Sequence, residues 1–228
     1  MSSRIYNVGV IGASGRMGQE LLAILKEKKI SAISFSQSTS PVDQVTAKGL
    51  DLLIDFSSPK GFDEALKTSV ALKIPLISGT TGLSAKQKQA LRQASRKIAV
   101  LWSPNMSLGI ALMKKAMGLF AQLKGFDFQI EEAHHSKKKD RPSGTALLLQ
   151  ETLTASLPQK VKLPEPLVAR LGGIIGIHKV YAVSEEELIC FEHQALTRKV
   201  FAAGAIRAGE WIIKQKPGLY VMEDLFNA

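Results

Sequence analysis

The stretch YNVGVIGASGRMGQELLAILKEK, residues 6–28, decides how the chain begins to fold. Its first part is a short apolar run that ends in glycine, which is typical of a buried parallel strand. Glycines at positions 12, 15 and 18 follow this run. The remainder carries its apolar residues on one stripe of a helix: Met17, Leu21, Leu22, Ile24 and Leu25. The stretch therefore predicts a strand, a tight turn and an amphipathic helix in direct succession.

The three glycines are spaced as G-x-x-G-x-x-G, a relative of the fingerprint of dinucleotide-binding folds. In this interpretation Gly12 allows the tight turn, Gly15 lets the backbone approach a pyrophosphate, and Gly18 lets the helix pack closely on the strand. The free N–H groups of the first helical turn would then face the phosphates. A glycine-rich turn can also be an ordinary tight turn, but its position between a strand and a helix favours dinucleotide binding.

Strand-like and helix-like segments continue to alternate through the first half of the chain. Short apolar runs at 30–36, 51–58, 75–82 and 98–104 predict strands, and helical patterns lie between the later ones. This alternation predicts a doubly wound parallel sheet. Four strand ends carry small polar sequences, GASGRMG, IDFSS, SGTTG and SPNMS. Because ligands bind beyond the carboxyl ends of such strands, we expect the cofactor there.

The end of the second expected strand bears on the choice of cofactor. Sites for NAD commonly place Asp or Glu there, on the ribose hydroxyls, whereas this strand ends in Ser36, Gln37 and Ser38. A 2′-phosphate would meet no carboxylate at that position, so the sequence favours NADPH, with NADH still usable. Arg16, inside the glycine-rich turn, is the nearest cationic candidate.

The pattern changes at about residue 106. Residues 106–125 predict one long helix, 127–135 a strand, and 143–157 a helix with Ser143 as its N-cap. Strand-like segments at 172–184 and 186–196 and a final helix at 201–215 follow. We therefore predict an α/β chain with two domains. Residues 1–105 plus 205–228 would form a Rossmann-like, parallel-sheet dinucleotide-binding domain, and residues 106–204 an α+β substrate and oligomerisation domain with a mixed sheet.

The stretch EEAHHSKKKDRPSGTALLLQ, residues 131–150, gathers two histidines and three lysines just ahead of a helix start. A solvated surface loop is the simplest interpretation. However, the N–H groups of Gly144 and Thr145 at the helix start can bind a carboxylate, and lysines add positive charge. A histidine also exchanges a proton near neutral pH. The stretch thus predicts an anion site with a proton donor beside it.

Composition limits the partners. The net charge of +10 is compatible with nucleic acid, acidic lipid or a small anionic substrate, but no aromatic residues interleave with the basic ones. The single cysteine, Cys190, excludes a disulfide framework and is expected to be a packed thiol. No apolar run approaches the roughly 20 residues needed to cross a bilayer, and no secretory signal is evident. We expect a cytoplasmic protein with no membrane, nucleic-acid or metal partner.

The pattern E-x-H-H-x-x-K-x-D-x-P-S-G-T-A, formed by residues 132–146, resembles the signature of the dihydrodipicolinate reductase family of bacterial lysine and diaminopimelate synthesis. GASGRMG, LIDFSSP, SGTTGL, SPNMSLG, RLGGIIGIH and HQALTRKVFAAGA also stand in the family's order across nearly the whole chain. The resemblance implies an NAD(P)H-dependent oxidoreductase. It would reduce a small cyclic unsaturated dicarboxylate, dihydrodipicolinate or 4-hydroxy-tetrahydrodipicolinate, to tetrahydrodipicolinate.

The resemblance also implies roles for individual residues. His134 would donate the proton with Lys138 as its catalytic partner. The substrate would be held by His135, Ser143, Gly144 and Thr145. Together with the end of the second strand, the strand-end segments would line the cofactor: Gly12, Ala13, Ser14, Gly15, Arg16, Met17, Ser36, Gln37, Gly79, Thr80, Thr81, Ser103, Pro104, Asn105 and Met106. Family members pair their second-domain sheets into a homotetramer, which we also expect here.

Some features depart from the family pattern or leave alternatives open. The chain is short between the first helix and IDFSS, Arg141 stands where Ala is usual, and Met106 replaces a common Phe. Another two-domain nicotinamide enzyme acting on an acidic substrate is one alternative, and a basic nucleic-acid-binding module that uses the lysine loop is another. We expect non-catalytic roles for the remaining polar residues. These are strand-end organisation for Asp55, loop orientation for Glu131 and Glu132, packing or local hydrogen bonding for His178 and His193, and a structural or hinge role for Arg198.

Overall fold

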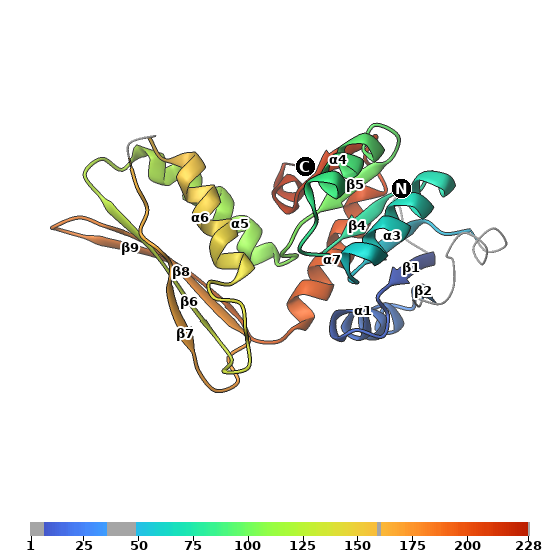
Figure 1. Cartoon of the computed structure of the whole chain (residues 1–228), viewed down its shortest axis with the longest axis horizontal. Coiled ribbons are helices and arrows are strands. Elements are labelled where there is room, and N and C mark those ends of the chain that lie inside the picture. The colour runs from blue at the N-terminus through green and yellow to red at the C-terminus, as the bar shows by residue number, and fades with distance from the viewer. Residues whose placement is uncertain (1–6, 36–48, 159–160, 228) are drawn as a thin grey trace. The chain divides into compact units, whose positions relative to one another are not determined.

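The structure is a computed structural model that describes residues 7–35, 49–158 and 161–227 (Figure 1). The chain divides into two compact units, Met1–Ser107 with Lys199–Ala228 and Leu108–Arg198, called here the first and second unit. The boundary expected at 204/205 falls inside α7 (Lys199–Ile212), and the structure assigns that whole helix to the first unit. The reason is that α7 packs on α1, β4 and β5, which belong to the first unit.

The first unit is built on a six-stranded sheet in which every pair is parallel. Its order is β10-β5-β4-β3-β1-β2. The strands are β1 (Asn7–Ile11), β2 (Ser31–Phe35), β3 (Leu52–Asp55), β4 (Leu76–Ser78), β5 (Ala99–Trp102) and β10 (Gly218–Tyr220). Within this sheet, β10 is the strand that was not predicted from the sequence, since it has no distinct apolar run. It extends the sheet from the C-terminal end of the chain.

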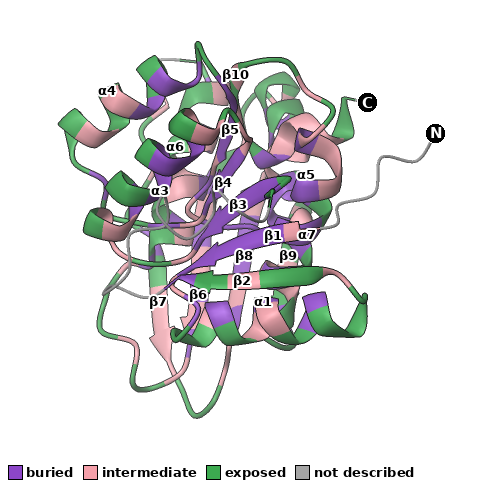
Figure 2. Cartoon of the chain, turned by 90° about the vertical axis from the view of Figure 1, so that its right-hand side faces the viewer, coloured by how far each residue is buried: buried purple, intermediate pink, exposed green. Residues whose placement is uncertain are grey.

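The helices of this unit follow from the order of the strands. From β1 the chain moves to β2 in one direction, and from β3 through β4 to β5 in the other. Right-handed crossovers therefore place α1 on one face and α3 and α4 on the opposite face, as Figure 2 shows. The direction reverses between β1 and β3, which is where ligands bind in such sheets. The bounds are α1 (Arg16–Glu27), α3 (Pro59–Leu72), α4 (Ala85–Ala94) and the 3-10 helix η2 (Met222–Phe226).

The central strands form the core of the first unit. In β3, the side chains of Leu52, Leu53 and Ile54 are fully buried, and Figure 2 shows the central strands as buried and the edge strand β2 as largely exposed. Helices on both faces account for this burial, so the strands are near-continuous apolar runs. Local signals start two of the helices: Ser58 caps α3, and Ser84 forms a capping box with Gln87 at α4.

The second unit has a mixed, four-stranded sheet of order β7-β6-β8-β9, in which β6 pairs with β7 in parallel and the other pairs are antiparallel. Its elements are α5 (Leu108–Met117), η1 (Gly118–Gln122), β6 (Asp127–His134), α6 (Gly144–Ser156), β7 (Leu167–Arg170), β8 (Gly176–Val183) and β9 (Leu188–Ala195). The single long helix expected at 106–125 is wrong. It is divided into α5 and the 3-10 helix η1 at Gly118, a residue type that is unfavourable inside a helix.

The two faces of this sheet differ. Helices α5 and α6 cover one face (Figure 1), where Phe128, Ile130 and Val180 join the core. The other face carries exposed side chains, among them Leu188 and Cys190. Cys190, expected to be a packed thiol, is exposed within the single chain, because the alternation of β9 turns the residue away from the helices. Within the described residues, no helix is both long and apolar enough to cross a membrane.

Candidate active site

The glycine-rich turn has the geometry that its spacing predicts. Gly12 has a φ of +82°, and a Cβ there would collide with the carbonyl oxygen of Phe56. A Cβ on Gly18 would collide with the carbonyl oxygen of Gly12, so the third glycine lets α1 pack against the turn. Gly15, the N-cap of α1, has no side chain to cap the helix. The first N–H groups of α1 are thus suited to bind a phosphate.

Asp55 ties together the neighbouring strand ends of the first unit. Its buried carboxylate accepts hydrogen bonds from the Ser78 hydroxyl at 2.7 Å and the Thr80 hydroxyl at 2.8 Å. It also accepts from both the hydroxyl and the backbone N–H of Ser57. Burial raises the pKa of Asp55, and these hydrogen bonds offset only part of the increase. As expected, Asp55 organises the strand end rather than facing solvent.

The predicted cofactor residues lie at the carboxyl ends of β1, β4 and β5, which belong to one sheet. The Trp102 indole donates to the carbonyl oxygen of Thr80 at 3.0 Å and so joins the last two of these ends. The predicted cofactor residues differ in exposure. The buried ones are Ala13, Thr80, Ser103, Asn105 and Met106, and the half-buried ones are Gly12, Met17, Gly79 and Pro104. The exposed ones are Ser14, Gly15, Arg16 and Thr81. Ser36 and Gln37 lie outside the described residues.

In the second unit a buried carboxylate, that of Glu132, stands at the centre of the candidate site. Its Oε1 accepts from the Ser143 N–H and from the Arg170 guanidinium, both at 2.9 Å. Its Oε2 lies 2.9 Å from Nδ1 of His134 and 3.8 Å from Nε2 of His178. Burial raises the pKa of Glu132, but the interactions with His134, Ser143 and Arg170 outweigh burial and hold this pKa well below its usual range. Glu132 is therefore ionised.

His178 completes this cluster from the next strand. Its Nε2 is 3.3 Å from the Ser143 hydroxyl, and its ring meets the ring of His134 edge-on with centroids 5.0 Å apart. Burial, followed by the charge of His134, lowers the pKa of His178 to about 3, so its ring is neutral at physiological pH. The sequence indicated packing or local hydrogen bonding, and did not indicate that His178 belongs to the site. The register of β6 and β8, which pairs Glu132 with His178, brings it there.

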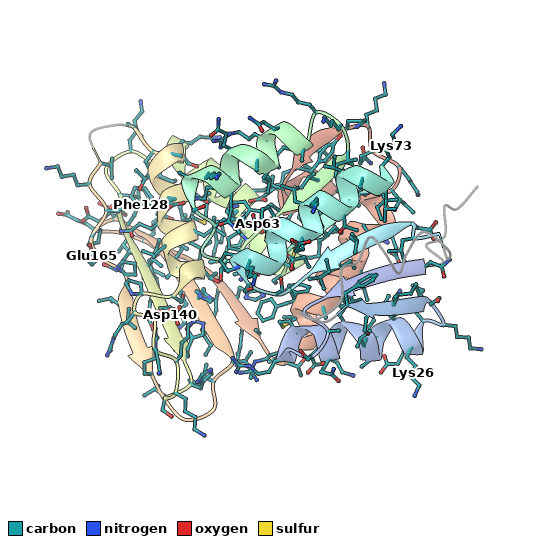
Figure 3. All side chains as sticks on the ribbon, turned by 45° about the vertical axis from the view of Figure 1, so that its right-hand side comes forward. Lys26, Asp63, Lys73, Phe128, Asp140 and Glu165 are labelled. Carbon is teal, nitrogen blue, oxygen red and sulfur yellow. The ribbon has the colours of Figure 1, made fainter. Side chains whose placement is uncertain are left out.

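The cationic loop leads from β6 to the start of α6. Lys138 Nζ is 2.8 Å from Oδ2 of Asp140 (labelled in Figure 3), and the Arg170 guanidinium donates to the Asp140 carbonyl at 2.6 Å. Ser143 caps α6 by accepting the Ala146 N–H at 3.1 Å, as predicted. Gly144 is exposed at the first position of the helix, and Thr145 and His135 are half-buried. Cations and a helix N-terminus thus meet in this loop, which suits an anionic substrate.

Sequence reasoning missed Arg170. It ends β7, a four-residue strand that follows the proline-rich KLPEP and was not predicted. Only the parallel pairing of β6 with β7 sets Arg170 opposite His134. The motif RLGGIIGIH, which contains both Arg170 and His178, was the available signal.

The cluster also concentrates unusual polar atoms. Four buried side-chain atoms here lack a well-aligned hydrogen-bond partner among the described residues: Glu132 Oε2, His134 Nδ1, Arg170 Nε and His178 Nδ1. Buried polar groups are nearly always hydrogen-bonded, so this concentration makes the cluster a candidate functional site. Donor atoms of Glu132, His134 and His178 also lie within 4.8 Å of one another, close enough to hold a metal ion. The Arg170 cation on the same carboxylate opposes a second cation.

The first unit is a doubly wound sheet with a glycine-rich turn at the point where the strand order reverses. The second unit has a buried cluster of Glu132 and two histidines beside the cationic loop and the start of α6. Together these features define a two-domain, dinucleotide-dependent oxidoreductase. The sequence matches the family models for the N-terminus of dihydrodipicolinate reductase over residues 6–106 and for its C-terminus over residues 109–226. The chain belongs to the dihydrodipicolinate reductase family, as its motifs indicated.

Individual relatives agree with this assignment. The chain is 46% identical over 219 residues to a 4-hydroxy-tetrahydrodipicolinate reductase of Bdellovibrio bacteriovorus, covering 96% of this chain and 95% of the relative. It is 35% identical over 239 residues to one of Campylobacter lari, covering 96% and 98%. A dipicolinate-bound dihydrodipicolinate reductase from a Paenisporosarcina species has the same fold, with a TM-score of 0.80 at 19% identity over 97% of this chain and 99% of that one. The predicted fold class and the enzyme interpretation are confirmed, and the chain is an NAD(P)H-dependent oxidoreductase.

Proposed function

We propose that this chain reduces 4-hydroxy-tetrahydrodipicolinate, or the dihydrodipicolinate derived from it, to tetrahydrodipicolinate, with NADPH as the preferred reductant. The observation that carries the proposal is the buried cluster of Glu132, His134 and Arg170 next to the capped start of α6. It combines a residue that can give a proton with a place for carboxylates. The first unit would bind the dinucleotide, and the second would bind the substrate.

The chemistry explains why these groups occur together. Bound NAD(P)H supplies a hydride to the conjugated ring of the substrate. The ring then holds an electron-rich enamine, which takes up one proton at carbon to complete the saturation of one double bond. His134 supplies this proton. Because its Nδ1 faces the ionised Glu132, the imidazolium form has a stabilising partner until the proton leaves.

Binding of the substrate falls to the loop and the helix start. The N–H groups of Gly144 and Thr145 and the positive end of the α6 dipole would hold one carboxylate. His135 and Lys138 would supply further donors and charge. Lys138 is already held in the loop by Asp140. The exposed Lys137 and Lys139 would contribute only general positive potential.

Exchange of His134 for glutamine tests the proposal. We expect His134→Gln to lower kcat by about 10²–10⁴-fold with a much smaller change in KM, because proton donation acts in the transition state. Lys137→Gln, in the same loop, is the matched control and should change kcat less than twofold. Lys138→Ala should harm both kcat and KM. Equal, mild effects of the His134 and Lys137 exchanges would contradict the proposal.

The preference between cofactors depends on residues 36–38. These residues lie outside the described part of the chain, and the strand that leads to them, β2, ends at Phe35. Ser36 and Gln37 would hydrogen-bond a 2′-phosphate, with Arg16 as the nearby cation. We expect kcat/KM to favour NADPH over NADH by about one order of magnitude, equivalent to roughly 1.4 kcal/mol. Gln37→Asp should reverse the order by repelling the phosphate. A native preference for NADH would contradict this part of the proposal.

The second unit would also assemble the protein into a homotetramer. On the sheet face opposite α5 and α6, Leu167 and Leu188 are more than half exposed, at 55% and 58%. A second copy of the sheet would remove this apolar surface from water. For the homotetramer that the family resemblance implies, light scattering should give four times the chain mass, and Cys190 on the same face should react slowly with a thiol reagent. A stable monomer at micromolar concentration would overturn the assembly.

A further inference from the structure

We infer that Glu132 is a positioning residue: its buried carboxylate fixes the proton donor, His134, relative to the substrate-binding start of α6. The inference rests on the proposed function, because it assigns to Glu132 a task within that reaction. Glu132 is not expected to touch the substrate, since its side chain is fully buried.

The two oxygens of the carboxylate serve two different parts of the site. Oε1 accepts the backbone N–H of Ser143, the N-cap of α6, at 2.9 Å. Oε2 faces Nδ1 of His134, also at 2.9 Å. One rigid group therefore joins the helix start, where the substrate carboxylate would lie, to the ring that would protonate the substrate. A displacement of either part by about 1 Å can cost about 10²-fold in rate.

Arg170 holds the carboxylate itself in place. Its guanidinium donates to Glu132 at 2.9 Å, to the Asp140 carbonyl at 2.6 Å and to the Ala169 carbonyl at 2.7 Å. The same side chain thus fixes Glu132 and the loop that carries Lys138. Such bonds to ionised groups are about twice as strong as neutral ones. The position of Glu132 is therefore set by Arg170 and does not depend on the contact with His134.

The arrangement also selects which nitrogen of His134 gives the proton. Nδ1 faces Glu132, whereas Nε2 lies over Gly176, where an added Cβ would be only 3.1 Å away. Nε2 is therefore the atom left for the substrate. Arg170 from β7, neutral His178 from β8 and Lys138 from the loop are the other titratable or charged groups around this cluster, and His193 lies beyond His178 on β9. Glu132 is thus the one carboxylate that these contacts place at His134.

The contact between His134 and Glu132 is short but not well aligned, because neither Nδ1 nor Oε2 forms a regular hydrogen bond. Catalytic hydrogen bonds are often misaligned in the free enzyme and improve when the substrate binds. A small rotation of the His134 ring would align the two atoms, and the absence of a side chain at Gly176 leaves room for it. Gly176 therefore contributes to the positioning of His134.

The first test is Glu132→Gln, which keeps the shape and removes the charge. We expect kcat to fall about 10²-fold while the Kd of pyridine-2,6-dicarboxylate, a flat mimic of the substrate, changes less than about threefold. Loss of the carboxylate should also move the alkaline limb of the kcat profile to lower pH by about one unit. Glu131→Gln, the neighbouring residue on the opposite face of β6, is the matched control and should leave both measurements unchanged.

The second test leaves Glu132 in place. Gly176→Ala pushes the His134 ring by a few tenths of an ångström, so kcat should fall about tenfold with KM nearly constant. Gly118→Ala is its control, since an added Cβ there meets no other atom within 4 Å. If Glu132→Gln does not fold, Gly176→Ala still decides the matter, because an unchanged kcat in that variant overturns the inference.

Different results would refute the proposed function and the positioning role of Glu132. A wild-type chain that does not reduce the substrate, or a His134→Gln variant as active as wild type, would refute the proposed function. An active wild type and an impaired His134→Gln variant, together with a Glu132→Gln variant that keeps kcat and its pH profile, would refute only the positioning role.

Discussion

Among the described residues, each unit buries one carboxylate in a strand, Asp55 in β3 and Glu132 in β6, but the two carboxylates have different surroundings. Asp55 is surrounded by the hydroxyls of Ser57, Ser78 and Thr80. Glu132 is met by a guanidinium, an imidazole and a backbone N–H. Both side chains are fully buried. Yet burial raises the pKa of Asp55, whereas the partners of Glu132 hold its pKa well below the usual range.

The difference shows that burial alone does not decide the charge of a buried acid, because the partners around the carboxylate can offset the effect of burial. Neutral hydroxyls stabilise the carboxylate of Asp55 only in part, so that site is suited to organising loops around a cofactor. The cation of Arg170 keeps Glu132 ionised, so that site can stabilise a protonated histidine. The same residue class thus serves structure in one unit and, as we propose, proton transfer in the other.

Removal of the cation from the Glu132 site should give the largest effect. Arg170→Met leaves a buried carboxylate without its partner, which typically costs about 3–5 kcal/mol of unfolding free energy. Urea denaturation measures this loss. The matched control is Arg207→Met on α7, where the side chain is 69% exposed and its nearest contact to Glu210 is 3.5 Å. A change below about 1 kcal/mol is expected there. Similar losses in both variants would show that burial of the pair is not what matters.

Removal of one hydroxyl from the Asp55 site should have a smaller effect. Thr80→Val deletes a hydrogen bond of 2.8 Å to a carboxylate, and bonds to charged groups contribute roughly 1.5–3 kcal/mol. Thr68→Val, on α3, is the matched control. The Thr68 hydroxyl is buried without a hydrogen-bond partner among the described residues, so its loss should be neutral or stabilising. Thermal unfolding of the two variants compares them directly, and equal destabilisation would argue against the Asp55 network.

The smallest effect, and the most direct test of the contrast, is in the pH dependence of stability. A depressed folded pKa contributes stability that is present above the unfolded pKa and lost as pH falls. The destabilisation by Glu132→Gln should therefore shrink as pH falls below about 4.5. A raised folded pKa acts in the opposite sense, so the destabilisation by Asp55→Asn should shrink as pH rises above about 4. Urea unfolding from pH 3.5 to 7 measures both trends, and slopes of the same sign would contradict the contrast between the two carboxylates.

Features that depend on neighbours in the sequence were predictable from the sequence itself. The positive φ of Gly12, the close approach at Gly18 and the N-cap of Ser143 all follow from local backbone geometry. The apolar runs likewise indicated the parallel sheet, since strands buried on both faces need no polar alternation. Family motifs then marked His134 and Lys138 as candidates, although their catalytic roles stay predictions.

Which residues meet across strands depends on the tertiary fold and could not be predicted from the sequence. Arg170 and His178 reach Glu132 through the registers of β6 with β7 and with β8. Strands β10 and β7 lie outside the apolar runs from which the other strands were predicted. The exposure of Cys190 likewise depends on which face of the sheet α5 and α6 cover. The physical reason is that local conformation is set by residues a few positions apart. The charge of a buried acid is set instead by whichever donors the fold brings within about 3 Å of it.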